Sequence, residues 1–277
     1  ECGLKQLEPT VKPVNSLMQL PLPADMRQQV LSSKPATDYY FPAEIQHHIL
    51  NEQSVAVTYH FKADKRTIVL HFVLFNKRTS DLNMNKMAKK AKRVCALMRL
   101  VSLHANRATC SATLNIFVYM THFKKLLPDE KGKAFDTEHA NTGMSYHCSR
   151  DNDIVVYREE EWFKVLIHES FHAFGLSFIE SDMEDGVDAA MQSVLKKTYA
   201  ISHPVRVYET YCEIWARILN VVFACFADGE HGNHADSDVD FAIFGECVLK
   251  GLHKDAEFAL HQCAKIMQHM DIPASVM

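Results

Sequence analysis

The sequence lacks the features by which several protein classes are recognised. It has no run of 18 apolar residues, so we expect no membrane-spanning helix. It has no internal repeat and no low-complexity segment. Its formal net charge is only −4, which gives no overall reason to expect nucleic-acid binding. The 277 residues are 47% hydrophobic, enough for the core of one large domain or of two packed lobes.

A Cys-x-x-Cys pair is also missing, although the chain has eight cysteines. Scattered cysteines in a chain of this length are typical of reduced thiols rather than of a disulfide framework. We therefore predict a reducing compartment: a cell interior, a virion or an organelle matrix. The sequence does not distinguish among these three. Because the chain begins with Glu1, we expect a processed product or a fragment, which a targeting segment could once have preceded.

Composition divides the chain into three regions. Residues 1–50 contain six of the nine prolines, which predicts an irregular leader held against the rest of the chain or against a protein partner. Residues 51–180 carry the strand patterns and are predicted to form one lobe. Residues 181–277 show only helical patterns and are predicted to form a second, helical lobe.

The individual elements follow from hydrophobic spacing. Residues 54–61 and 66–75 are rich in β-branched and aromatic side chains and predict a β-hairpin. Further strands are expected at 111–120, around 141–143 and at 154–157, and helices at 82–104, 187–199, 206–226, 239–252 and 255–270. Lysines and an arginine are concentrated at 86–93; we interpret them as a solvated helical face, with a phosphate or nucleic-acid patch as the less favoured alternative.

Residues 168–172 read His-Glu-x-x-His. On a helix, residues four apart share one face, so His168 and His172 could hold one metal ion between them. Neutral imidazoles suit Zn²⁺, and an open coordination position would lower the pKa of bound water towards neutrality. Glu169 would then be the general base that takes the proton of that zinc-bound water.

The surrounding sequence supports a helix here. Phe163, Ile167, Phe171 and Phe174 recur at helical spacing and predict a buried stripe. Glutamates at 159–161 are expected in the first turn, and Gly175 lies near the expected end. The alternative is a buried helix whose two histidines only hydrogen-bond to neighbours.

A catalytic zinc usually has three protein ligands. Metzincins supply a third histidine six residues after the second, but Phe178 occupies that position here, which excludes their arrangement. Glu209 and Glu213 lie four apart on a later apolar helix, where carboxylates need a partner or a metal. We favour Glu209 as ligand and Glu213 as the group that supports a liganding imidazole, with the reverse assignment and a purely structural pairing with arginine or tyrosine left open.

This pattern resembles the gluzincin group of zinc metallopeptidases, over about residues 54–226. The segment from Arg158 to Glu169 is also similar to metallopeptidase-like proteins of large DNA viruses. The resemblance implies an α+β, zincin-like fold with a mixed-sheet amino lobe, a metal-binding helix and a helical carboxyl lobe that carries the glutamate.

The implied function is zinc-dependent hydrolysis of a peptide or protein substrate. Zinc would polarise the scissile carbonyl, and a tyrosine or histidine would stabilise the oxyanion. Candidates for that last role are Tyr208, Tyr211, His203 and His231. The alternative function is a catalytically silent subunit of a large assembly, a virion or an organellar complex, that keeps the fold as a scaffold.

Overall fold

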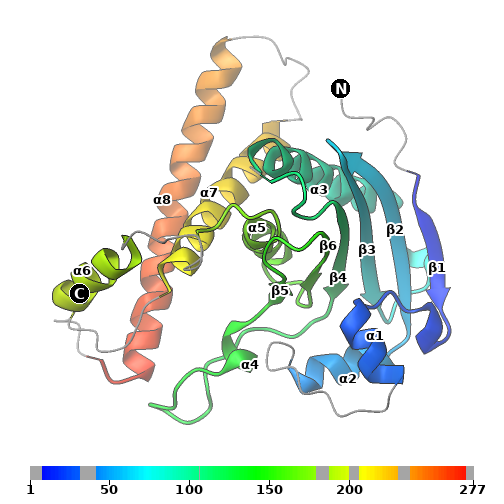
Figure 1. Cartoon of the computed structure of the whole chain (residues 1–277), viewed down its shortest axis with the longest axis horizontal. Coiled ribbons are helices and arrows are strands. Elements are labelled where there is room, and N and C mark those ends of the chain that lie inside the picture. The colour runs from blue at the N-terminus through cyan, green and yellow to red at the C-terminus, as the bar shows by residue number, and fades with distance from the viewer. Residues whose placement is uncertain are drawn as a thin grey trace. The chain divides into compact units, whose positions relative to one another are not determined.

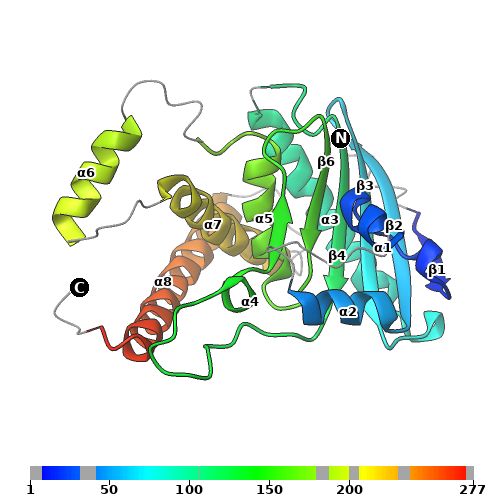
Figure 2. The ribbon, with the colours of Figure 1, turned by 60° about the horizontal axis from the view of Figure 1, so that its bottom comes forward.

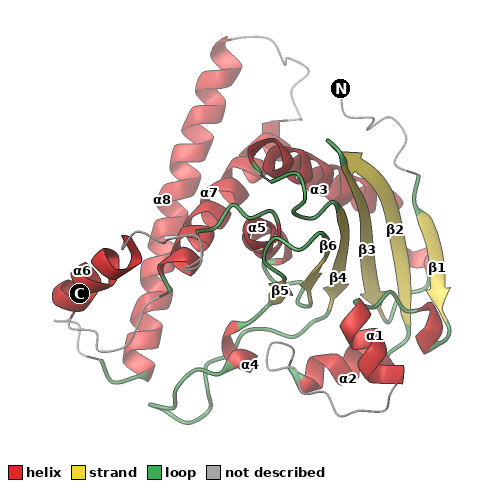
Figure 3. Ribbon diagram, viewed as in Figure 1, coloured by secondary structure: helices red, strands yellow, loops and turns green. Residues whose placement is uncertain are grey.

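A computed structural model describes residues 8–31, 42–105, 107–178, 187–199, 206–229 and 238–272 (Figures 1 and 3). These residues form an α+β structure with one six-stranded mixed sheet and eight α-helices, which confirms the predicted fold class at that level. The chain divides into two compact units: residues 1–125 with 136–176, and residues 126–135 with 177–277.

The sheet belongs to the first unit and runs in the order β1-β2-β3-β4-β6-β5. Its strands are β1 (Thr10–Val14), β2 (Ser54–Ala63), β3 (Arg66–Phe75), β4 (Thr113–Met120), β5 (Gly143–Ser145) and β6 (Asp151–Val156). β3, β4 and β6 are parallel, whereas β1, β2 and β5 pair antiparallel with their neighbours. The predicted hairpin is confirmed: Ala63 pairs with Arg66, and Asp64 adopts a positive φ of 54° in the two-residue turn between them.

One face of the sheet carries α3 (Met84–His104) and α5 (Trp162–Ala173) (Figure 2). The ring of Phe72 on β3 lies 5.6 Å from the ring of Trp162. Lys90 and Arg93 on α3 lie over the rings of Trp162 and Phe163, at 5.3 and 4.0 Å from the centroids. The prediction that the basic residues form a solvated face of α3 is therefore wrong for Lys90 and Arg93, because their long side chains pack on aromatic rings of α5.

The opposite face is covered by α1 (Ala24–Leu31) and α2 (Ala43–Asn51). Because successive strand residues point to opposite faces, Val73 and Phe75 face away from Phe72 and pack with Leu20 and Ile49. The prediction of an irregular leader is wrong for the described part of residues 1–50. Its prolines lie at element boundaries and on an edge strand, where a missing N–H is tolerated, and its apolar residues complete this core layer.

The remaining short elements of the described chain are η2 (Leu17–Gln19), η3 (Thr79–Asp81) and α4 (Thr137–Ala140). The second unit contains α6 (Val187–Tyr199), α7 (Val207–Gly229) and α8 (Asp238–His269). Two separate helices were predicted over 239–252 and 255–270, but α8 is continuous. Its Gly251 lies inside the helix, where a Cβ atom would come within 2.5 Å of Val221 on α7, so it serves close helix packing rather than a break.

α7 and α8 pack antiparallel through contacts spaced four residues apart. Arg217 donates to Asp255 at 2.7 Å, Val221 meets Gly251, and Cys225 is joined to Cys247. No helix in the described part of the chain has the length and apolar character that crossing a bilayer requires.

Two disulfides contradict the prediction of reduced thiols for four of the eight cysteines. Cys110 pairs with Cys148 in the first unit and Cys225 with Cys247 in the second. The partners are 38 and 22 residues apart in sequence, so no local motif could indicate them.

Candidate metal centre

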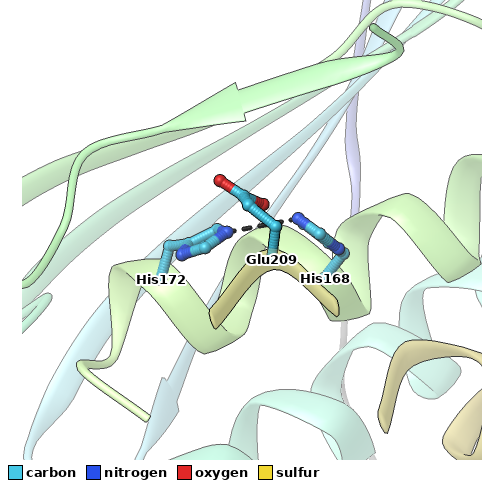
Figure 4. Close-up of side chains that lie close together, drawn as sticks. All are labelled: His168, His172 and Glu209. Carbon is cyan, nitrogen blue, oxygen red and sulfur yellow. Dashed lines mark hydrogen bonds between the residues drawn. The ribbon is translucent and has the colours of Figure 1, made fainter. Parts of the chain in front are cut away.

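Helix α5 presents the two histidines of the motif on one face. Nε2 of His168 and Nε2 of His172 lie 3.2 Å apart, and both rings are half-buried (Figure 4). The helical prediction is confirmed, with Phe163, Ile167, Phe171 and Phe174 all buried. The glutamates expected in the first turn instead precede the helix, which begins at Trp162.

The separation of the two imidazoles fits a shared zinc ion. Two nitrogens at about 2.0–2.1 Å from a tetrahedral zinc are about 3.3 Å apart. The observed 3.2 Å lies close to that value. It also suits an N–H···N hydrogen bond in which one imidazole carries the proton on Nε2. The separation therefore fits either a shared proton or a shared metal ion, and a metal ion here would not require the helix to rearrange.

Glu169 is buried, and its carboxylate is held by the neighbouring strand. Oγ of Ser145 on β5 donates to Oε2 of Glu169 at 2.7 Å and lies 3.1 Å from its backbone carbonyl oxygen. A hydrogen bond from a strand to a helix fixes the orientation of a carboxylate that would otherwise sample several rotamers. Sequence reasoning missed Ser145, because a three-residue strand is too short for a hydrophobic period to reveal.

Gly143 explains how β5 approaches the helix so closely. A Cβ atom at Gly143 would lie 2.8 Å from Cγ1 of Val165 and 3.3 Å from Cγ of Glu169. Gly143 and Ser145 are two apart on the strand and so lie on the same side of it. The glycine supplies the close approach that brings the serine hydroxyl within hydrogen-bonding distance of the glutamate.

The other predicted site residues belong to the second unit. Glu213 lies 3.9 Å from Arg217, which is itself held by Asp255 on α8. Tyr211 packs against Phe178, with ring centroids 5.2 Å apart, and Tyr208 is half-buried near the start of α7. His203 and His231 lie outside the described residues, so their roles stay predictions.

Glu209 lies in the first turn of α7 and is half-buried. Among the described residues, His168, His172 and Glu209 form a group in which one potential ligand atom from each lies within 4.8 Å of the others (Figure 4). Glu213 is not a member of this group.

No protein-family model, no curated protein and no solved structure matches the chain.

Proposed function

We propose that this chain is a zinc-dependent peptidase with a zincin-like fold of the gluzincin type. His168, His172 and Glu209 would hold the metal, which when bound would activate water and polarise the scissile carbonyl. The observation that carries the proposal is that the two imidazoles and the carboxylate of Glu209 form one group of potential ligands. A buried glutamate, Glu169, directly follows the first of the two histidines in sequence.

Glu169 is the proposed general base. Its carboxylate takes a proton from the attacking water and later returns it to the nitrogen of the leaving amine. Ser145 keeps Oε2 in a fixed direction through its hydroxyl, so the carboxylate does not need to reorient during the reaction. A scaffold protein needs no base in this position, and this favours the enzyme over the catalytically silent alternative.

The substrate would be a peptide in an extended conformation. β5 is the last strand in the sheet order and lies directly beside the metal helix. An extended peptide can add to such an edge through backbone hydrogen bonds. Tyr208 and Tyr211 on α7 are the described candidates for stabilising the oxyanion.

Elemental analysis after dialysis tests the metal, and we expect about one zinc per chain. Digestion of a peptide library by wild type and by Glu169→Gln tests the base. The amide keeps the shape of the carboxylate but cannot take a proton, so the variant should retain zinc and lose about 10²–10⁴-fold in rate. Wild-type protein that binds zinc but cleaves no peptide would instead favour the structural role, and protein that takes up no zinc would refute the peptidase and leave the structural role.

A further inference from the structure

The disulfide of the first unit lies against the end of the metal helix. It joins Cys110, in the turn before β4, to Cys148, in the turn between β5 and β6. Gly175, with a φ of 66°, follows the last turn of α5, and a Cβ atom there would lie 3.3 Å from Sγ of Cys110 and 3.5 Å from Cβ of Cys148. The two half-cystines therefore pack directly against the residue at which the helix stops.

Both bridged turns hydrogen-bond to consecutive carbonyls of that helix end. The backbone N–H of Cys148 donates to the carbonyl oxygen of His172, the proposed ligand, at 3.2 Å. Oγ of Ser111 donates to the carbonyl oxygen of Ala173 at 2.7 Å. The position of His172 is thus fixed by two segments that one covalent bond holds together.

The backbone of both turns adopts an unfavourable conformation. Cys148 has a φ of 44° and Ser111 a φ of 52°, in the left-handed region that such residues seldom occupy. Conformations of this kind persist only where the surrounding structure enforces them. The disulfide supplies one such restraint, and the N–H of Ser111, which donates to the carbonyl oxygen of Ser149 at 2.7 Å, supplies another.

The same turn also leads to the base. Only two residues separate Cys148 from Ser145, whose hydroxyl donates to Glu169. One covalent bond therefore restrains both the strand that orients the carboxylate and the helix end that carries His172. Cys110 is fully buried, whereas Cys148 is partly exposed, so Cys148 is the half-cystine more open to a reagent.

We propose that the Cys110–Cys148 disulfide is a thiol-exchange site that latches the metal centre, and that a dithiol reductant opens it and weakens metal binding. The inference rests on the metal site proposed above. A thiolate of the dithiol attacks Sγ of Cys148 and forms a mixed disulfide, while the bond to Cys110 breaks and its sulfur leaves as a thiolate that takes up a proton. The second thiol of the reductant then attacks the mixed disulfide, so that Cys148 leaves as a thiol and the reductant as its cyclic disulfide.

The test is the zinc dissociation constant of the full chain, measured by competition with a chromophoric chelator. Variant Cys110→Ala/Cys148→Ala removes the latch and leaves neither of its two cysteines as a thiol that could itself bind zinc. We expect its affinity to fall by about 10–100-fold, as for the loss of other groups that support a ligand. The matched control is Cys225→Ala/Cys247→Ala, which removes the disulfide of the second unit, 16 residues along α7 from Glu209, and should cause a clearly smaller loss of affinity.

A second measurement does not depend on the folding of a variant. Wild-type protein is reduced with dithiothreitol, freed of the reagent without air, checked by circular dichroism and titrated with zinc. Dithiothreitol also reduces Cys225–Cys247, so the control double variant, which lacks that bridge, is treated in the same way. Weaker binding by both still-folded proteins supports the latch, and reoxidation should restore the affinity. Equal affinity in both redox states, equal losses in the two double variants, or global unfolding on reduction would overturn it. Oxidised wild type that binds no zinc would refute the metal site itself, and the latch with it.

Discussion

Helices α5 and α7, which supply the proposed ligands, are held in place by different means. α5 has 12 residues and is restrained along its length: Ser145 and Gly143 of β5 meet it at Glu169, and two bridged turns bind its end. α7 has 23 residues and packs along α8 through contacts repeated every four residues. The difference teaches that the histidine pair is a local property of one helix, whereas the glutamate depends on a second folding unit.

The largest effect is expected from breaking the local pair. His172→Ala should reduce the zinc content from about one per chain to none after dialysis, because two remaining donors cannot make a catalytic site. His60→Ala, at an exposed position on β2, is the matched control and should keep its zinc. Retention of stoichiometric zinc by His172→Ala would show that the metal binds elsewhere.

Next in size is the contribution of α7. Glu209→Ala should weaken zinc binding by more than the roughly 10–100-fold that loss of a supporting group costs. Glu213→Ala should weaken it less, because Glu213 lies beside Arg217 rather than in the donor group. Zinc titrations of the two variants rank them directly, and a larger loss in Glu213→Ala would reverse the assignment.

A smaller effect is expected on the strand side of α5. Ser145→Ala removes the hydroxyl that orients Glu169 and should lower kcat by about 10–100-fold. KM and zinc affinity should stay unchanged, because neither donor histidine is touched. Ser145→Thr retains the hydroxyl and should restore most of the rate. If Ser145→Thr were as slow as Ser145→Ala, the role would be packing and not hydrogen bonding.

The last expected effect is a pH dependence of the free energy of unfolding that comes from the sheet unit. Burial, helped by nearby His60, lowers the pKa of His71 on β3 to about 4. Unfolded, the imidazole titrates near 6.5, so between these values the unfolded chain binds a proton that the folded chain excludes. Stability should therefore be full above about pH 6.5 and fall towards about pH 4, with a loss of about 2 kcal/mol by about pH 5.

Urea unfolding at neutral and mildly acidic pH measures this loss. Oγ1 of Thr58 lies 2.9 Å from Nδ1 of His71. The variant His71→Asn keeps a hydrogen-bonding partner for Thr58 but has no group that titrates, so the free energy of unfolding should depend less on pH. His104→Asn, at the exposed end of α3, should leave it unchanged. The same pH slope in both variants would mean that another group is responsible.

Several features could be predicted from the sequence because their information is local. The hairpin strands, α3 and α5 have regular hydrophobic patterns that extend over ten or more residues. The His-Glu-x-x-His spacing needs only one helical turn to bring two imidazoles together. Residues 1–50 could not be predicted correctly, because their many prolines indicate irregular structure and their regular elements are short. Apolar residues of this segment, such as Leu20 and Leu22, are buried in a core cluster with residues of the sheet, a contact that is not local in sequence. The continuity of α8 could not be read from the sequence, because a glycine such as Gly251, which here packs against Val221 inside the helix, can equally stand at a helix end.

The sequence by itself determined which residues could form a metal-binding pair and which glutamate lies next to them, since helical geometry fixes neighbours three and four residues apart. It left Glu209 and Glu213 as alternatives, because the choice between them depends on a second folding unit. The tertiary structure alone also decided that Ser145 meets Glu169 and that Cys110 meets Cys148. These partners lie 24 and 38 residues apart, and contacts at that distance depend on strand order and packing, which no local pattern encodes.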